Sequence, residues 1–234
     1  MAAARSRNRH PLTNNFLSMY SFPLDDFQLR GCHSLEDGRS VLVAAPTGAG
    51  KTIVGEFAAF LADRHGTRCF YTTPIKALSN QKFQELTKIY GESEVGLLTG
   101  DSSINGDAPI VVMTTEVLRN MIYASPDSLT SLGFVVMDEV HYLADKFRGA
   151  VWEEILIHLP ERIQVISLSA TVSNAEEFGD WLVSVRGETD VVLSEIRPVP
   201  LYQHILIGNR LLDLLDRKST RLNSSHSSVS RMPS

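Results

Sequence analysis

The sequence has few cysteines and no long apolar run. Only Cys32 and Cys69 occur among its 234 residues, too few for a disulfide framework, so we expect a reducing compartment and a cytoplasmic protein. No apolar stretch approaches the roughly 20 residues of a membrane-spanning helix, and we expect no membrane partner. The arginine-rich start lacks the apolar segment of a secretory signal. We therefore expect residues 1–19 to form a disordered leader, with an organelle transit peptide as the alternative for this arginine-rich, acid-free start.

The sequence also lacks an excess of basic charge, with 22 lysines and arginines against 27 acidic residues. Its last residues, 216–234, are rich in serine, have no apolar periodicity and resemble a translated sequencing adapter, so we expect a non-native tail. This tail contains four of the basic residues and one acidic residue, which leaves 18 basic and 26 acidic residues and a net charge of −8. Proteins that hold nucleic acid by overall charge are basic, so any such site here must be local.

What the sequence does contain is a regular alternation of two kinds of segment. Short β-branched apolar runs, typical of strands buried on both faces, occur at 40–45, 68–74, 95–100, 109–115, 133–139, 164–170 and 190–194. Helical patterns occur between them at 51–64, 76–90, 115–123, 151–159 and 174–185. The alternation predicts an α/β domain over residues 20–195 with a doubly wound, mostly parallel sheet.

The stretch APTGAGKT follows the first apolar run and matches the P-loop pattern G-x-x-x-x-G-K-[ST], with alanine at its first position. Gly48 and Gly50 let the backbone curl so that several N–H groups converge, and the next helix adds its positive N-terminal end. Lys51 can reach the terminal phosphates, and the Thr52 hydroxyl can hold Mg²⁺. We predict that a nucleoside triphosphate is bound by Ala45, Pro46, Thr47, Gly48, Ala49, Gly50, Lys51 and Thr52.

Two further motifs end apolar runs, where ligand sites lie in sheets of this kind. In VVMDEVH, Asp138 can also hold Mg²⁺, and Glu139 is placed to orient and deprotonate an attacking water. In LSAT, the hydroxyls of Ser169 and Thr171 can hydrogen-bond His141 or the two carboxylates and so couple the nucleotide to the rest of the fold. Each motif alone could be an ordinary strand end, but the P-loop upstream favours a functional interpretation.

Six motifs follow one another in order: APTGAGKT, TTPIKALSNQK, LLTGD, MTTEVLRNM, MDEVH and LSAT. This series resembles the first RecA-like domain of a P-loop, superfamily-two helicase of the DExH-box (DEVH) group. The stretches DKFRGAVWEEILIHLP and FPLDDFQ are similar to the superkiller-like and HelY-type branch of RNA helicases. The resemblance covers about residues 20–205, and alanine at position 45 is the usual form in that group. It implies a motor that hydrolyses ATP, with Mg²⁺, while moving along single-stranded RNA.

The resemblance also assigns roles to residues outside the P-loop. Gln28 in FPLDDFQ would read the edge of adenine, with Phe22 or Phe27 beside the base, although core packing is an equal alternative for both rings. His141 would complete the catalytic DEVH series. A row of donors at strand ends would follow the phosphates of nucleic acid without reading its bases, and solvation alone is the alternative for its two cations. The row consists of Thr73, Pro74, Lys76, Thr99, Gly100, Thr114, Thr115, Glu116 and Arg119.

A second RecA-like domain is also implied, which would close over ATP and supply arginines to the transferring phosphoryl group. Its motifs do not occur in the sequence, so we expect residues 196–215 to be a linker or its beginning, and the fragment alone to be inactive. Three hypotheses remain: an RNA helicase motor domain, a DNA-repair helicase of the same group, or a module that holds ATP and nucleic acid without turnover. Arg148–Glu154 has no assigned role. Trp152 and Trp181 are expected to pack in the core, with a base-stacking platform as the alternative for Trp152.

Overall fold

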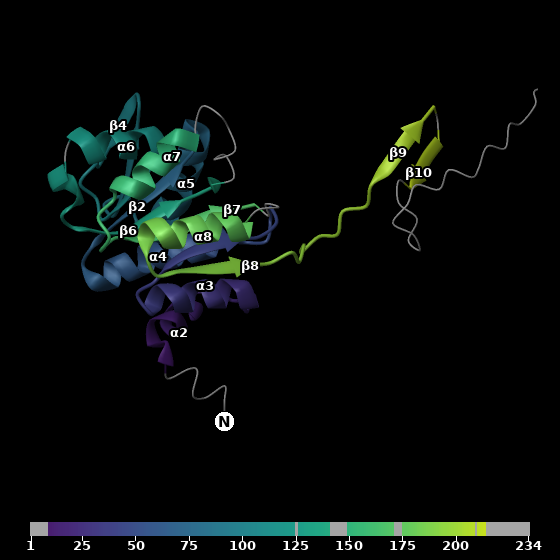
Figure 1. Cartoon of the computed structure of the whole chain (residues 1–234), viewed down its shortest axis with the longest axis horizontal. Helices are drawn as coiled ribbons and strands as arrows, with labels where there is room; N and C mark the ends of the chain where they lie inside the picture. The colour runs from purple at the N-terminus through teal and green to yellow at the C-terminus, as the bar shows by residue number, and fades with distance from the viewer. Residues whose placement is uncertain (1–8, 125, 141–148, 171–174, 209, 214–234) are drawn as a thin grey trace, which may run out of the picture. The chain divides into compact units, whose positions relative to one another are not determined.

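A computed structural model of the chain describes residues 9–124, 126–140, 149–170, 175–208 and 210–213 (Figure 1). The chain divides into two units after Ile196, close to the end that the sequence predicts for the α/β domain. The first unit contains an eight-stranded sheet with helices on both faces. The described part of the second unit contains an antiparallel hairpin of β9 (His204–Ile207) and β10 (Arg210–Asp213). The tail at 216–234 lies outside the described residues.

The apolar runs of the sequence form the strands of the large sheet. Their order is β4-β3-β5-β2-β6-β7-β1-β8, and every neighbouring pair is parallel except β3 with β4. The strands are β1 (Ser40–Ala44), β2 (Arg68–Thr73), β3 (Val95–Thr99), β4 (Ser102–Ile104), β5 (Ile110–Thr114), β6 (Leu132–Met137), β7 (Gln164–Ser169) and β8 (Thr189–Leu193). The prediction of a mostly parallel α/β sheet is therefore confirmed.

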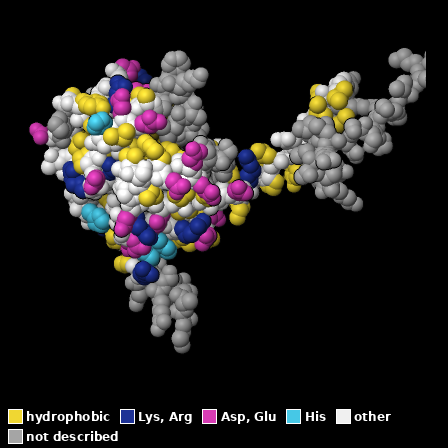
Figure 2. All heavy atoms as spheres, viewed as in Figure 1, with side chains coloured by type: hydrophobic (Ala, Val, Ile, Leu, Met, Phe, Trp, Pro, Cys, Tyr) yellow, Lys and Arg dark blue, Asp and Glu magenta, His cyan; other side chains and the backbone are white. Residues whose placement is uncertain are grey.

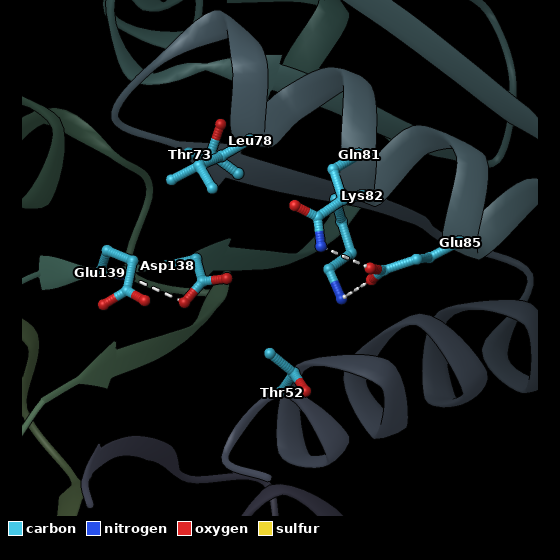
Figure 3. Close-up of a pocket in the computed structure, with 8 residues that line it drawn as sticks. All are labelled: Thr52, Thr73, Leu78, Gln81, Lys82, Glu85, Asp138 and Glu139. Carbon is cyan, nitrogen blue, oxygen red and sulfur yellow. Dashed lines mark hydrogen bonds and ion pairs between the residues drawn. The ribbon is translucent and has the colours of Figure 1, made fainter. Parts of the chain in front are cut away.

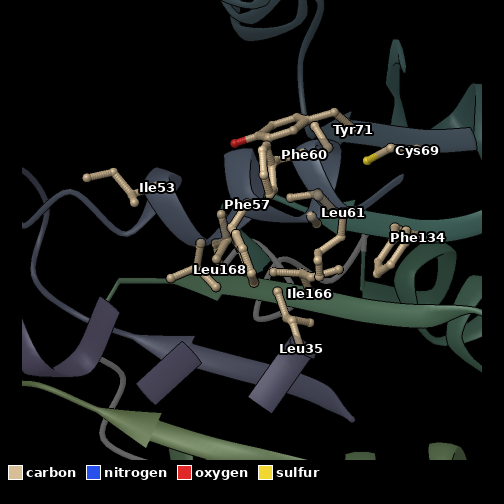
Figure 4. Packing of buried hydrophobic residues seen from close by; sticks show 14 of the residues in the cluster. Leu35, Ile53, Phe57, Phe60, Leu61, Cys69, Tyr71, Phe134, Ile166 and Leu168 are labelled. Atoms are coloured by element: carbon tan, nitrogen blue, oxygen red, sulfur yellow. The ribbon is translucent and has the colours of Figure 1, made fainter. Parts of the chain in front are cut away.

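Alternate residues of each strand enter the two hydrophobic layers that cover the sheet. Val41 and Val43 of β1 belong to one layer, while Leu42 between them belongs to the other. The first layer is formed with α2 (Pro11–Leu17), α3 (Asp26–Glu36), α4 (Thr52–His65) and α5 (Lys76–Tyr90), and part of it is drawn in Figure 4. The second is formed with α6 (Thr115–Ala124), α7 (Gly149–His158) and α8 (Ala175–Arg186). A short 3₁₀ helix, η1, covers Pro126–Leu129.

Helix α2 corrects the expectation of a disordered leader at 1–19, which is wrong for residues 11–17. Phe16 is only 1% exposed, and its ring centroid lies 5.0 Å from that of Phe57 in α4. The first turn of α2 is held by Glu36, whose carboxylate accepts hydrogen bonds from the backbone N–H groups of Leu12 and Thr13 at 2.8 and 2.7 Å. Both partners come from elsewhere in the chain, so local composition could not reveal them.

Helix α3 and strand β4 were not predicted either. Asp25 and Gln28 form a capping box at the start of α3, a helix-start signal within FPLDDFQ. Strand β4 has only three residues. It lies at the edge of the sheet and pairs antiparallel with β3, the strand just before it in the sequence. Neither element changes the fold class, but α3 brings Gln28 to the P-loop.

The burial of the two tryptophans agrees in part with the expectation that both pack in the core. Trp152 is buried in the second layer, as expected of a packing residue, whereas Trp181 is only partly buried and stacks on Phe178 with ring centroids 5.8 Å apart. Cys32 and Cys69 are both buried and free. Within the described ranges, no helix has the length and apolar character needed to cross a membrane.

Candidate functional site

The carboxyl ends of the parallel strands meet at one edge of the sheet, where a cavity of about 290 Å³ lies between the ends of β2 and β6 and the helices α4 and α5. The P-loop leaves β1 there, Asp138 follows β6, and the β2 strand ends at Thr73. Figure 3 shows Asp138 facing the side chains of α5 across the cavity, with Glu139 on the other side of Asp138 and Thr52 at the start of α4. The lining consists of Thr52, Thr73, Leu78, Gln81, Lys82, Glu85, Asp138 and Glu139.

The P-loop has the backbone conformation that its glycines predict. Gly48 and Gly50 have φ angles of +83° and +79°, a left-handed region that most side chains avoid. A Cβ atom on Gly50 would lie 2.7 Å from Nε2 of Gln28, so the position also lacks space for a side chain. The N–H of Ala45 donates to the carbonyl of Ser169 at 3.1 Å, which fastens the start of the loop to the end of β7. Lys51, next to helix α4, is buried.

Gln28 contacts the P-loop backbone, a contact that the sequence did not predict. Its Nε2 group donates to the carbonyl oxygens of Gly50 at 3.0 Å and Ala49 at 3.3 Å, and its Oε1 accepts from the backbone N–H of Asp25 at 2.8 Å. The amide is therefore engaged at both ends in this structure, and it is only 3% exposed. Reading of adenine by Gln28 would require at least one of these bonds to open.

The two phenylalanines expected near the base lie in different surroundings. Phe27 is buried in the first hydrophobic layer, which corresponds to the alternative of core packing. Phe22 is 51% exposed and lies edge-on against Tyr20, with ring centroids 5.4 Å apart. Of the two rings, only Phe22 is accessible to a nucleotide base without a rearrangement of the core.

The Asp138 carboxylate is buried and held by two donors. The Tyr71 hydroxyl donates to its Oδ2 at 2.9 Å, and the backbone N–H of Glu139 donates to its Oδ1 at 2.9 Å. Burial raises the pKa of Asp138, while the hydrogen bond from Tyr71 acts in the opposite direction. Asp138 is 8% exposed and borders the cavity, so one side of the carboxylate remains open to it.

Glu139 has a left-handed backbone, with φ at +57°, which is uncommon for a residue other than glycine. Such conformations cost about 1–3 kcal/mol and persist where the surrounding structure fixes them, often at functional sites. The turn at Glu139 places two successive carboxylates on the border of one cavity, which an extended strand could not do because its side chains alternate between faces.

The opposite wall of the cavity contains charged residues of α5 that the sequence analysis missed. The side chain of Lys82 is 9% exposed, and its Nζ lies 2.6 Å from the Glu85 carboxylate and 3.7 Å from that of Glu56. The same Nζ lies over the ring of Tyr71, 5.4 Å from its centroid. A sequence signal for Lys82 was available in the helical spacing of Ser79, Lys82 and Leu86. These are the buried positions of α5, so the spacing places a lysine on the buried face of the helix.

Most hydroxyls of the expected nucleic-acid row are engaged within the protein. Thr73 shares a hydrogen bond with the Ser79 hydroxyl at 2.7 Å, and the Thr115 hydroxyl donates to the Thr73 carbonyl at 3.1 Å. The Thr99 hydroxyl donates to Asp101 at 3.0 Å. Four threonines and the proline of the row are buried, Gly100 is exposed, and Glu116 and Arg119 are intermediate.

The two cations of this row both lie near carboxylates. Lys76 has a side chain 46% exposed and forms an ion pair with Asp101. Hydrogen bonds from Lys76 and then Thr99 lower the pKa of the Asp101 carboxyl. Arg119 lies 3.9 Å from the Glu154 carboxylate of α7. Both cations are at the surface, where ion pairs contribute little and can be exchanged for a phosphate.

Comparison with known proteins decides the family. A family model described as DEAD/DEAH box helicase matches residues 25–178, which is most of the chain. The chain belongs to this helicase family. The resemblance drawn from the sequence motifs is thereby confirmed.

Individual helicases of the family resemble the chain over most of its length. HelY of Mycobacterium tuberculosis (strain ATCC 25618 / H37Rv) is 63% identical over 203 residues, which cover 87% of this chain and 22% of that protein. The ATP-dependent RNA helicase mtr4 of Schizosaccharomyces pombe is 47% identical over 188 residues, covering 80% of this chain and 17% of its own. The chain thus spans about a fifth of the length of these curated relatives.

A solved structure extends the comparison to three dimensions. Helicase Lhr of Mycobacterium smegmatis, bound to single-stranded DNA and AMP-PNP, superposes with a TM-score of 0.62 at 28% identity. The match covers 78% of this chain and 27% of that one. The α/β sheet described above is therefore the fold of a RecA-like helicase domain.

Of the three remaining residues expected in the helicase site, only Ser169 lies among the described residues. His141 and Thr171 lie outside the described residues. Ser169 is buried at the end of β7, and its carbonyl, rather than its hydroxyl, contacts the P-loop through Ala45. Ser169 lies between the strands that carry the P-loop and Asp138, because β7 separates β1 from β6.

Proposed function

We propose that this chain is the ATP-binding motor domain of an ATP-dependent RNA helicase, in which ATP hydrolysis drives movement along single-stranded RNA. The observation that carries the proposal is the convergence of Thr52, Asp138 and Glu139 on one cavity at the carboxyl edge of the sheet, directly beside the P-loop. The two buried free cysteines are compatible with a cytoplasmic location.

The P-loop would hold the phosphates of ATP. Left-handed Gly48 and Gly50 turn backbone N–H groups toward a common point, and the start of α4 adds the positive end of its dipole. Lys51 follows directly and would bring a cation to the terminal phosphates. The other loop residues, Ala45, Pro46, Thr47 and Ala49, would contribute mainly backbone groups.

The donor set beside the loop fits a magnesium ion. Thr52 and Asp138 border the same cavity, and a hydroxyl and a carboxylate supply the oxygen ligands that Mg²⁺ prefers. Mg²⁺ in ATP sites takes only one or two carboxylates and completes its shell with water and phosphate oxygens. When bound there, the ion would neutralise charge that develops on the transferring phosphoryl group.

Glu139 would act on the attacking water. Its left-handed backbone puts Glu139 on the border of the cavity, next to the carboxylate that would hold the metal ion. A carboxylate in that place can accept a hydrogen bond from the water, orient it toward the γ-phosphate and take its proton. His141 would complete this group in the DEVH series.

The nucleic acid would lie along the ends of β2, β3 and β5. Because the buried threonine hydroxyls there bond within the protein, the contacts would come from backbone N–H groups, from exposed Gly100 and from the surface cations Lys76 and Arg119. Such contacts follow phosphates and do not read bases. They also reconcile an acidic chain with a nucleic-acid substrate.

RNA is the preferred substrate because the mtr4 relative is named an RNA helicase and is more similar in sequence than Lhr, which was solved with single-stranded DNA. A DNA helicase is the second candidate, favoured by that Lhr complex alone. Competition between single-stranded RNA and DNA of the same sequence for the full-length protein separates the two. A second RecA-like domain, following residues 196–215, would be needed for turnover.

Nucleotide binding is tested with a fluorescent ATP analogue and Mg²⁺. Lys51→Ala should remove most of the binding shown by the parent chain, because the phosphates lose their cation. Lys88→Ala is the matched control: Lys88 is exposed on α5, and its loss should change nothing. Equal binding by the parent and Lys51→Ala would show that the P-loop assignment is wrong.

A further inference from the structure

Tyr71 of β2 has a polar group in an apolar place. It is fully buried, and its ring belongs to the hydrophobic layer drawn in Figure 4. Its hydroxyl nevertheless donates to Oδ2 of Asp138, 67 residues away in sequence. Strands β2 and β6 are neighbours with Tyr71 opposite Val136, so the sheet itself brings the hydroxyl to the residue that follows β6.

The ring of Tyr71 is held in place by charged residues as well as by the core. The Lys82 ammonium lies over it and is itself paired with Glu85 and Glu56. Glu56 in turn accepts a hydrogen bond from the Tyr20 hydroxyl at 2.9 Å. These contacts involve the face of the ring and would survive removal of its hydroxyl.

The two donors to Asp138 divide its oxygens between them. Tyr71 donates to Oδ2 and the Glu139 N–H to Oδ1, so neither oxygen depends on water for its first partner. The terminal torsion of an aspartate is otherwise broad, which would let the carboxylate plane rotate. With both oxygens fixed, the remaining lone pairs keep one direction relative to the cavity that Thr52 also borders.

We propose that Tyr71 is a positioning residue for the magnesium site, because its hydroxyl fixes the orientation of the Asp138 carboxylate before the ion binds. The inference rests on the proposed function, since it takes Asp138 as a ligand of Mg²⁺. Outer hydrogen-bond partners of ligating groups commonly change metal affinity by about 10- to 100-fold when they are removed. Tyr71 acts through Asp138 and does not itself contact the ion.

The test compares nucleotide binding with and without Mg²⁺ in the full chain. Tyr71→Phe keeps the ring and removes only the hydroxyl. We expect the Mg²⁺ concentration that half-saturates binding of a fluorescent, non-hydrolysable ATP analogue to rise about tenfold. Affinity for the analogue in EDTA should not change, because the P-loop is intact.

Tyr90→Phe is the matched control. Its hydroxyl donates to the backbone carbonyl of Glu56 at 3.4 Å, in the same layer but without contact to Asp138. It should leave both the Mg²⁺ dependence and the affinity in EDTA unchanged. Each titration is performed well below the unfolding midpoint of its own variant, and the rise of that midpoint on adding Mg²⁺ with nucleotide gives a second measurement.

Three results would count against the inference. An unchanged Mg²⁺ requirement in Tyr71→Phe overturns it, and so does an equal loss of affinity with and without Mg²⁺, which indicates a merely structural role. A parent chain that binds the analogue without regard to Mg²⁺ overturns the proposed metal site itself, and the inference with it. Failure of the Tyr71 inference and failure of the proposed metal site are distinguished by the parent chain, because only the second removes the Mg²⁺ dependence of the parent.

Discussion

Two proposed sites lie toward opposite ends of the carboxyl edge of the sheet, and they differ in how their polar groups are used. At the proposed nucleotide end, Thr52, Asp138 and Glu139 border a cavity. At the proposed nucleic-acid end, the buried hydroxyls of Thr99 and Thr115 donate to neighbouring protein atoms. The first end thus has a cavity for a ligand, whereas most polar groups of the second already have partners within the protein.

This difference indicates two kinds of binding. A preformed cavity gives large effects when a single contacting group is removed, because no other group takes its place. A row of backbone donors and a few surface cations spreads the binding over many weak contacts, and each of them contributes little. The predictions that follow test this contrast between the two ends.

The largest effects are expected on ATP hydrolysis, from the absence of a second domain and from a change at Glu139. The isolated chain should show almost no RNA-stimulated ATPase activity, because arginines from a second domain are worth about 10³–10⁵ in rate in related phosphoryl transfer. Joined to its natural continuation, the chain should hydrolyse ATP, and Glu139→Gln in that protein should abolish hydrolysis while ATP binding persists. Steady-state phosphate release and analogue binding measure the two quantities.

Robust RNA-stimulated hydrolysis by the 234-residue chain alone would contradict the need for a second domain. A Glu139→Gln protein that loses binding together with hydrolysis would contradict the role in water activation, because it would assign Glu139 to ligand binding instead.

A smaller effect is expected at Lys76, on the nucleic-acid end. Lys76→Ala should weaken binding of single-stranded RNA several-fold and lower the slope of log affinity against log salt by about 0.7, the value for one lost phosphate contact. Lys88→Ala, on the far part of the same helix, is the control. An unchanged salt dependence in Lys76→Ala would show that Lys76 remains paired with Asp101 in the complex.

An effect on stability rather than binding is expected at Thr115. Thr115→Val removes the donor to the Thr73 carbonyl and leaves that buried group unpaired, at a cost of about 1–3 kcal/mol in the free energy of unfolding. Thr87→Val is the control, because the Thr87 hydroxyl is buried and has no hydrogen bond within the described residues. Urea unfolding of both variants measures the loss in free energy of unfolding. Equal losses in Thr115→Val and Thr87→Val would contradict the structural role of Thr115.

The smallest effect is expected from the tail. Deletion of 216–234 should leave the thermal midpoint and nucleotide binding within error, because a serine-rich segment with few apolar residues has little to bury. The shortened chain would then be a clean background for comparing the two ends. A clear drop in the midpoint would show that the tail contributes to the fold.

Periodic patterns made the sheet and most helices predictable. The seven apolar runs became strands, and α4 to α8 lie within two residues of their predicted positions, because their signals are local. Helix α2 was missed because Phe16 and Glu36 stabilise it through distant contacts. Short-range signals cannot show such pairs.

The same limit applies to the candidate site. The motifs identified the residues that border the cavity on the P-loop side, because strand ends gather at one edge of a parallel sheet. They did not show that Gln28 bonds the P-loop backbone, or that Tyr71 bonds Asp138 at the end of the neighbouring strand. The sequence therefore indicated where chemistry would occur, but not which hydrogen bonds hold its groups in place.

Strand β7 lies between β1 and β6, the two strands that lead into the proposed nucleotide site, and this order sets the distance between the two halves of the site. Neighbouring strands are about 4.8 Å apart, so the P-loop after β1 and Asp138 after β6 start about two strand spacings from each other. Changes in loop length cannot alter that gap, because the hydrogen bonds of the sheet set it. The surrounding loops could thus be redesigned while the span between the P-loop and Asp138 stays the same.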